Sequence, residues 1–319
     1  MGNFSLIVYK KESARPSLLS KVLESFKKER FEDYTQEISL SENCKGFLVT
    51  LPYGYEKLHE LRKGEILRFK NYMDSLVRDK SLENVILTEK LEHLDWLKDF
   101  KGQKYNGQTL YQALLVYILI EIFSGRGIKI GGLDIAVVHG QNNRVLFEIV
   151  GMLASDIKYL TVISDRKQEL EEEMERIYSD TGLSVGITED CRSGLKNADV
   201  IINLGNLGGM GINSRINPKA LIINFCQVDS DKAFAENTII NSVEIKFPKS
   251  GAGETKEIAG EFFGSLQLAE IILMHKISGE AQNSVLKKLA HEFRKDGYAI
   301  SGFVGRRTLI KTKGIMVGK

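Results

Sequence analysis

The sequence predicts an α/β protein that combines a doubly wound parallel sheet with a smaller N-terminal α/β domain. Short apolar runs with strand character alternate with amphipathic helical stretches over residues 132–247, which is the order of a parallel sheet with helical crossovers. A second, shorter series of such runs lies within residues 4–100. At 319 residues the chain is long enough for two domains, each with its own core.

The stretch GLDIAVVHGQNNRVLFEIVGMLASDIKYLTVISD, residues 132–165, predicts a strand, a glycine turn, a helix and a second strand. This order is typical of the first βαβ unit of a dinucleotide-binding, or Rossmann, domain, where the turn and the helix N-terminus meet a pyrophosphate. After Gly140 stand Gln141, Asn142 and Asn143, where the glycine fingerprint has further glycines. The turn is therefore expected either to bind phosphate or to need Gly140 only for its backbone angles.

The first part of the chain predicts strands at residues 4–9, 34–40, 46–51 and 84–88. Helices are predicted at 17–28, 56–79 and 91–100. Pro52 ends the third strand, and the loop after it holds Tyr53, Gly54 and Tyr55.

The second part begins with a helix over residues 110–123 that is apolar on all sides, so we expect it to be buried. Helices follow at 166–179 and 190–197, and strands at 183–188, 200–204, 220–225 and, as a sixth, 243–247. Two terminal helices are predicted at 258–278 and 284–296. The predicted domains are 1–104, 105–260 and 261–319, the last packing back on a cleft between the other two.

Composition excludes several classes of protein. A hydrophobic fraction of 43%, a charged fraction of 27% and a net charge of +2 indicate a globular chain without a nucleic-acid partner. Cys44, Cys191 and Cys226 are far apart, which favours a reducing compartment over disulfides or a metal site. The chain shows neither signal-peptide order nor a membrane span, so a cytoplasmic location is expected. The oligomeric state stays open, and a homodimer is allowed.

Two further loops are candidates for binding a nucleotide. Asp165 could accept a hydrogen bond from the ribose of NAD, whereas Arg166 and Lys167 could pair with the 2′-phosphate of NADP; alternatively, Asp165 caps a solvated helix. The glycine loop at 205–211 allows the close backbone approach that a nicotinamide ribose requires. The predicted cofactor-binding residues are Gly140, Gln141, Asn142, Asn143, Ser164, Asp165, Arg166, Gly205, Asn206 and Gly208.

Three separated segments resemble known enzyme families. GFLVTLP, residues 46–52, looks like the Gly-x-Asn-Val-Thr-x-Pro strand of shikimate dehydrogenases and is similar to a segment of methylene-tetrahydrofolate dehydrogenases. Residues 132–225 resemble the nucleotide domain of shikimate dehydrogenases and of bacterial long-chain acyl-carrier-protein reductases. Residues 262–280 and 289–303 are similar to the terminal helices of those reductases. The resemblance implies a bacterial oxidoreductase with a small or acyl substrate, using NADP or NAD with NADP slightly favoured.

The chain departs from these families at their catalytic positions. Gly54 stands where shikimate dehydrogenases have a catalytic lysine, and Gln267 where the acyl reductases, matched on Glu270, have a nucleophilic cysteine. Tyr53 or Tyr55 is therefore expected to donate the proton, with Gln267 in the catalytic region. The expected substrate-binding residues are Thr50, Asn106, Gln108 and Thr109. The alternative is a catalytically inactive descendant that binds a ligand or a partner.

Overall fold

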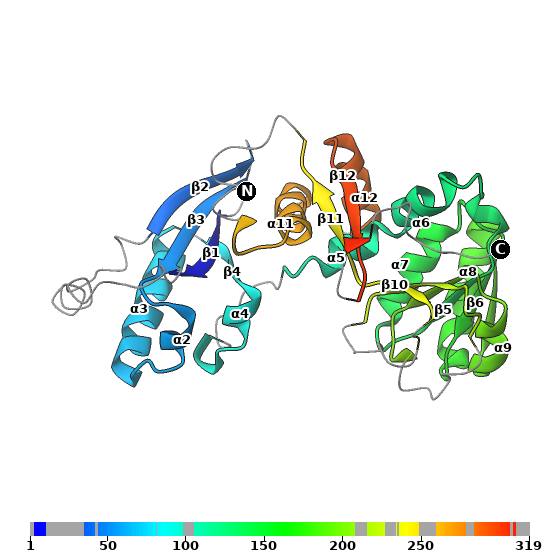
Figure 1. Ribbon diagram of the computed structural model, residues 1–319, viewed down its shortest axis with the longest axis horizontal. Coiled ribbons are helices and arrows are strands. Elements are labelled where there is room, and N and C mark those ends of the chain that lie inside the picture. Colours follow the sequence, from blue (N-terminus) through cyan, green and yellow to red (C-terminus); the bar gives the residue numbers. More distant parts are fainter. Residues whose placement is uncertain are drawn as a thin grey trace. The chain divides into compact units, whose positions relative to one another are not determined.

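The computed structural model describes residues 3–10, 35–41, 44–80, 82–97, 105–207, 216–226, 234, 236–248, 260–278, 284–306 and 309–310. The chain divides into two compact units (Figure 1). Unit 1 comprises Met1–Gly107 and Phe247–Glu280, and unit 2 comprises Gln108–Lys246 and Ala281–Lys319. The terminal segment 261–319 is thus shared: helix α11 (Ser265–Ile277) belongs to unit 1 and α12 (Val285–Lys295) to unit 2. The expected cleft between domains stays a prediction.

Unit 1 contains a four-stranded sheet in the order β2-β3-β1-β4. Its strands are β1 (Asn3–Tyr9), β2 (Thr35–Ser41), β3 (Cys44–Leu51) and β4 (Leu82–Leu87). Strand β1 runs parallel to both β3 and β4, and β2 is antiparallel to β3. In the described part of this unit, the helices besides α11 are α2 (Tyr55–Leu58), α3 (Lys63–Asp79), α4 (Glu89–Glu92) and the 3-10 turn η2 (Asp95–Leu97). The helix predicted at 17–28 lies outside the described residues.

Helices cover both faces of this sheet, which explains the nearly continuous apolar run of β1. Leu6 and Val8 pack in one cluster with Ile271 of α11. Ile7 points to the other face and packs in a second cluster with Phe69 of α3. Alternate residues of a strand point to opposite faces, so a strand buried on both sides needs apolar residues at every position.

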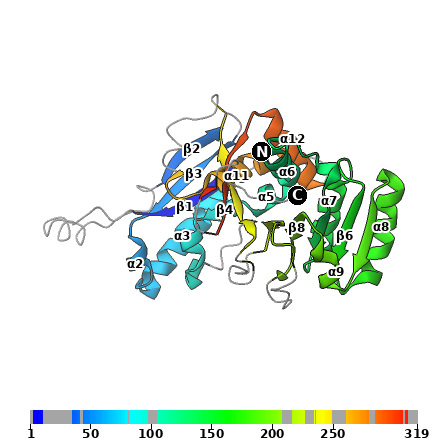
Figure 2. The ribbon, with the colours of Figure 1, turned by 45° about the vertical axis from the view of Figure 1, so that its right-hand side comes forward.

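Unit 2 is built on a six-stranded sheet in the order β10-β9-β8-β5-β6-β7, parallel at every pair. The strands are β5 (Ile135–Val138), β6 (Tyr159–Ile163), β7 (Ser184–Thr188), β8 (Val200–Asn203), β9 (Leu221–Asn224) and β10 (Thr238–Ile240). Helices α7 (Asn143–Leu153), α8 (Lys167–Thr181) and α9 (Cys191–Lys196) connect them (Figure 2). The predicted α/β class, with a doubly wound parallel sheet and a smaller N-terminal domain, is confirmed.

The prediction that residues 243–247 add a sixth strand to the parallel sheet is wrong. The sixth parallel strand is β10, whereas β11 (Ser242–Lys246) joins β12 (Ala299–Val304) and β13 (Leu309–Ile310) in a separate antiparallel sheet. The chain leaves the parallel sheet at Asn241, whose backbone N–H donates to the carbonyl of Val304 at 2.8 Å. The sheet to which β11 belongs is decided by its pairing with a strand far along the chain. Hydrophobic periodicity within residues 243–247 carries no information about that pairing.

The apolar helix predicted at 110–123 is two helices, α5 (Gln108–Ala113) and α6 (Leu115–Ser124), with a break at Leu114. Most of its apolar residues are buried as expected, but 42% of Ile120 on α6 is exposed. Helix α6 packs on α7 and on the 3-10 turn η3 (Ile130–Gly132), and α5 packs on α12. No helix in the described ranges combines the length and the apolar character needed to cross a membrane.

Candidate functional site

Strand order in unit 2 reverses beside β5, which is paired with β8 on one side and β6 on the other. Open α/β sheets bind ligands beyond the carboxyl ends of their strands at such a point. The described residues of the predicted cofactor set all follow one of these three strands: Gly140, Gln141, Asn142 and Asn143 after β5, Ser164, Asp165 and Arg166 after β6, Gly205 and Asn206 after β8. Gly208 lies outside the described residues.

The loops after β5 and β8 touch each other through two glycines. A Cβ on Gly140 would lie 2.9 Å from the carbonyl carbon of Leu204, and one on Gly205 would lie 3.1 Å from that of His139. Gly140 does not have a positive φ. The requirement for glycine here therefore comes from close packing of two loops, and not from the backbone angles expected for the turn.

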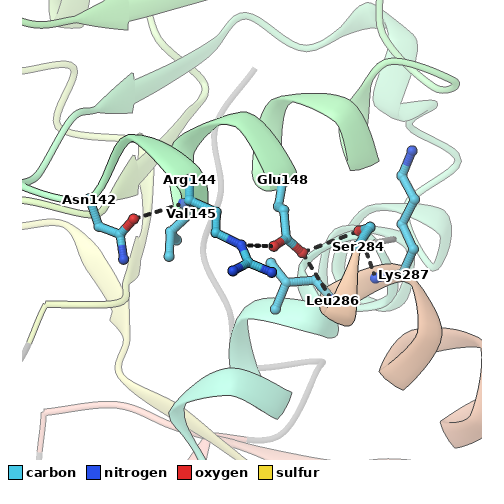
Figure 3. A network of polar contacts seen from close by, with 7 residues as sticks. All are labelled: Asn142, Arg144, Val145, Glu148, Ser284, Leu286 and Lys287. Carbon is cyan, nitrogen blue, oxygen red and sulfur yellow. Dashed lines mark hydrogen bonds and ion pairs between the residues drawn. The ribbon is translucent and has the colours of Figure 1, made fainter. Parts of the chain in front are cut away.

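Helix α7 begins directly after this turn and is capped by Asn142. The Asn142 Oδ1 accepts a hydrogen bond from the backbone N–H of Val145 at 3.3 Å (Figure 3). Gln141 and Asn142 are exposed. The N-terminus of α7 thus offers a helix dipole and amide donors beyond the carboxyl end of β5, the arrangement that binds phosphate, although one N–H is already satisfied by the cap.

The arginine that starts α7 points away from the turn. Arg144 Nε lies 3.3 Å from Oε1 of Glu148, whose Oε2 accepts hydrogen bonds from Ser284 Oγ at 3.2 Å and from the backbone N–H of Leu286 at 3.1 Å (Figure 3). Glu148 therefore fastens the start of α12 to α7. An open groove of about 650 Å³ lies beside this network, lined by Arg144, Phe147, Glu148, Gly151, Glu173, Arg176, Ser284 and Lys287.

The arginine after β6 lies on the turn instead. Arg166 Nη2 donates to the carbonyl of Gly140 at 2.7 Å and lies 3.2 Å from Nε2 of His139. The other imidazole nitrogen, Nδ1, lies 2.9 Å from Ser164 Oγ, which also accepts the backbone N–H of Arg166 at 3.0 Å. His139 and Ser164 are buried, whereas 32% of the Arg166 side chain is exposed.

These contacts fix the tautomer of His139. A guanidinium has only donors, so the Nε2 that faces Arg166 must accept, and the proton of the neutral ring is assigned to Nδ1, which donates to Ser164. Burial lowers the pKa of His139 from its ordinary value of 6.5, and the positive charge of Arg166 lowers it further. At neutral pH the ring is therefore uncharged.

A series of hydrogen-bonded asparagines, missed in the sequence, lies at the same edge of the sheet. Asn203 Nδ2 donates to Asn224 Oδ1 at 2.8 Å, and Asn224 Nδ2 donates to Asn241 Oδ1 at 2.9 Å. Each of the first two amides also accepts a backbone N–H two residues on, from Gly205 and Cys226 respectively, both at 3.3 Å. The matching segments VIINLG and LIINFC were the available signal.

Among the proposed proton donors, Tyr53 is held within unit 1 by two contacts. Its hydroxyl donates to Glu65 Oε1 at 3.2 Å, and the Lys57 ammonium lies 5.0 Å from its ring centroid. Hydrogen bonding by the Arg62 backbone lowers the pKa of Glu65, and the Tyr53 hydroxyl adds to the effect, so this acceptor stays ionised. Tyr53 is therefore occupied with a carboxylate on α3.

Tyr55 lies in an aromatic cluster at the carboxyl ends of β1 and β3. Its ring is 5.6 Å from that of Tyr9 and 5.0 Å from that of His59. The Lys90 ammonium lies 5.6 Å from the Tyr55 centroid and 5.9 Å from the Tyr9 centroid, a cation–π arrangement. Sequence reasoning missed Lys90, because it follows a different strand and only the parallel pairing of β1 with β3 and β4 brings it here.

Helix α11 holds Tyr105 and Gly107, the residues just before the boundary between the units. Gln267 Nε2 donates to the carbonyl of Tyr105 at 2.6 Å, and the buried Glu270 carboxylate accepts the backbone N–H of Gly107 at 2.8 Å. Gly107 has φ of +85°, which favours glycine. Two predicted residues thus lie together in unit 1, Gln267 and the exposed Asn106.

The other predicted substrate residues are more widely placed. Gln108 belongs to unit 2, where its Nε2 donates to the carbonyl of Phe225 at the end of β9 at 2.6 Å. Thr109 is half-buried in the first turn of α5, and Thr50 is half-buried in β3 of unit 1. No group of histidine, cysteine, aspartate or glutamate suited to a metal ion occurs in the described ranges.

The donors and acceptors at the unit 2 edge fit a nicotinamide dinucleotide. The N-terminus of α7 can hold the pyrophosphate, and the exposed Asp165 or the partly exposed Arg166 can meet the ribose or its 2′-phosphate. Gly140 packs against Leu204, so the exposed part of the turn is Gln141 and Asn142.

Comparisons with known proteins place the chain in no family. No protein-family model matches the sequence. No curated protein matches it either. Solved structures that resemble it include a shikimate dehydrogenase in complex with NADP+, with 12% identity, a TM-score of 0.37 and coverage of 92% of this chain and 96% of that one.

Two further similar structures are dehydrogenases in complex with NAD. Shikimate 5-dehydrogenase from Listeria monocytogenes, in complex with shikimate and NAD, has 11% identity and a TM-score of 0.32, covering 92% of this chain and 96% of its own. Quinate dehydrogenase from Corynebacterium glutamicum has 11% identity and a TM-score of 0.36, covering 92% and 99%. Because identity and superposition are both low, none of their activities is transferred to this chain on that account.

Proposed function

We propose that the chain is an NAD(P)-dependent oxidoreductase that acts on a small or acyl substrate. The observation that carries the proposal is the position of Arg166 on the β5–α7 turn, beside the reversal of strand order. A guanidinium held against the Gly140 carbonyl, next to a helix N-terminus, concentrates donors for phosphate groups at one edge.

A nicotinamide bound at this edge would supply the hydride, and the chain's residues would bind, orient and protonate. In the proposal the N-terminus of α7 holds the pyrophosphate, and Asp165 or Arg166 reads the ribose. The proposed substrate-binding residues are Thr50, Asn106 and Gln267 of unit 1, and Gln108 and Thr109 of unit 2. Of the two proton-donor candidates Tyr55 is preferred, since the Tyr53 hydroxyl is bonded to Glu65.

The cofactor is proposed to be NADP in preference to NAD. Arg166 is anchored on the turn by His139 and the Gly140 carbonyl, whereas Asp165 is exposed. A fixed guanidinium pairs well with the 2′-phosphate that distinguishes NADP.

A second candidate is a catalytically inactive protein that binds a ligand or a partner. Its specific support is that glycine at positions 140 and 205 is explained by loop packing alone. Gln267 is similarly engaged with the carbonyl of Tyr105. Residues that already have structural roles give weaker support for a reaction than residues without them.

The test is titration of the purified protein with NADPH and NADH, followed by nicotinamide fluorescence. Arg166→Ala is expected to weaken NADPH binding about 10- to 100-fold, the value of a lost charged hydrogen bond, and to leave NADH nearly unchanged. Arg144→Ala is the matched control, because this arginine follows the same turn but points to Glu148. Loss of NADH binding in Asp165→Ala would instead assign NAD. Binding of neither nucleotide at millimolar concentration would exclude the oxidoreductase and favour the inactive candidate.

A further inference from the structure

His139 holds the Arg166 guanidinium at one end of a short chain of hydrogen bonds. Ser164 Oγ fixes the ring through Nδ1 at 2.9 Å, and Nε2 faces Arg166 Nη2 at 3.2 Å. The same Nη2 donates to the Gly140 carbonyl at 2.7 Å. Both hydrogens of Nη2 are thereby used on the protein.

The Arg166 side chain is 32% exposed, and its other terminal nitrogen has a weaker partner. Nη1 lies 3.6 Å from Oε2 of Glu169, whose side chain is 56% exposed, so this ion pair is weak. A phosphate could displace that carboxylate and accept a charge-assisted hydrogen bond from Nη1–H. An arginine side chain fixed beforehand loses less rotamer entropy on binding than a mobile one.

We infer that His139 is a positioning residue that fixes Arg166 for a ligand phosphate, and so sets the preference between NADPH and NADH. This inference rests on the proposed function, and it deepens it by assigning selectivity to a buried residue that does not contact the nucleotide. Removing the Nε2 acceptor frees one Nη2 hydrogen and leaves the guanidinium less firmly fixed, held on the turn by the Gly140 carbonyl. We therefore expect a loss of affinity for NADPH, which carries the 2′-phosphate, and not for NADH.

The arrangement also makes the preference depend on pH. Protonation of His139 places a hydrogen on Nε2, opposite Arg166, and replaces a hydrogen bond by repulsion between two cations. The charged groups that act on the ring are Arg166, Asp165 and Glu169, and the two carboxylates oppose the arginine. Because the pKa of His139 is lowered from 6.5, the preference for NADPH is retained at neutral pH and declines only in more acidic solution.

The experiment compares dissociation constants of NADPH and NADH for the full chain and for three variants. His139→Leu removes the acceptor and is expected to weaken NADPH about 3- to 10-fold, with NADH changed less than about 2-fold. His139→Gln keeps an acceptor near Nε2 and is expected to restore most of the NADPH affinity. In the Arg166→Ala background, His139→Leu is expected to have no further effect on NADPH.

The outcomes separate this inference from the proposed function. Equal weakening of both nucleotides by His139→Leu, or no change in either, overturns the inference while the oxidoreductase stands. If the unchanged protein binds NADH but not NADPH, the inference about His139 is likewise overturned and the oxidoreductase proposal stands. Binding of neither nucleotide overturns both. Hydrogen exchange of β5 and β6 amides checks that each variant is folded, and a preference that follows the same pH profile in His139→Leu as in the unchanged protein also counts against the role of His139.

Discussion

Replacing Gly140 with alanine should destabilise unit 2, because a methyl group has no room between the loops after β5 and β8. Its Cβ would lie 2.9 Å from the carbonyl carbon of Leu204 and closer still to the carbonyl oxygen, whereas ordinary contact begins at 3.4 Å, so the loops must separate by more than half an ångström. The atoms that must move are backbone atoms, which cannot rotate away as a side chain does. Overpacking of this kind lowers the free energy of unfolding by about 1–3 kcal/mol.

A matched control lies in the same unit. A Cβ on Gly132 would meet no atom within 4 Å, so Gly132→Ala is expected to stay within about 0.5 kcal/mol of the unchanged protein. The pair Gly140→Ala and Gly205→Ala should cost less together than the sum of the single changes. Both methyl groups push the same two loops apart, and the second finds the space already opened.

The assay must report unit 2. Trp96, the only tryptophan, lies in unit 1, so its fluorescence follows the other unit. Hydrogen exchange of the β5 and β8 amides at increasing urea gives the free energy of unfolding where the change is made. If Gly140→Ala and Gly132→Ala are indistinguishable within about 0.5 kcal/mol, the loops are not in contact and the packing argument is refuted.

Three further side chains, Asn224, Glu148 and Cys44, each give a prediction about stability or reactivity. Asn224→Ala should destabilise unit 2 by about 2–3 kcal/mol in urea unfolding, because the buried amide of Asn203 loses its acceptor. Glu148→Ala should cost about 1 kcal/mol and speed hydrogen exchange in the first turn of α12, which the carboxylate caps. Burial raises the pKa of Cys44 to about 12, so a thiol reagent at pH 8 should modify Cys44 only after unfolding.

Each of these has a control and a contrary result. Asn197→Ala, at the exposed end of α9, should be neutral, and an equal loss at Asn224 and Asn197 would contradict the asparagine series. Arg144→Ala should cost less than about 0.5 kcal/mol, since 63% of that side chain is exposed; a larger effect than Glu148→Ala would contradict the capping role. Rapid modification of folded Cys44 at pH 8 would show that it is not buried.

Much of the fold follows from local pattern. The strands at 4–9, 46–51 and 200–204 were predicted within a few residues, because strand character is visible in short apolar runs. The alternation of strands and helices after residue 132 likewise predicted the parallel sheet. The failure at residues 243–247 has the opposite cause: partner choice depends on a strand almost sixty residues later, at Ala299–Val304.

The candidate site was only partly accessible to the same reasoning. The residues after β5 and β6 were found because a βαβ unit has a fixed order of strand, turn and helix. The reason for glycine at position 140 was not predicted, because that reason is a close contact with Leu204 on another loop. Lys90 and Asn241 were missed for a related reason: nothing in their own neighbourhoods indicates the tyrosines or the asparagine beside them.

By itself, the sequence determined the α/β class, the order of the elements and the position of the edge where a nucleotide would bind. Local propensity and periodicity carry that information, because they act over a few residues. Only the tertiary structure decided which side chains meet at the edge: Arg166 on the turn, Arg144 turned toward Glu148, and His139 uncharged between Ser164 and Arg166. The contacts of His139 with Ser164 and Arg166 join residues 25 or more positions apart, and Glu148 is held by Ser284 and Leu286 of a distant segment. No single segment of the sequence shows such contacts.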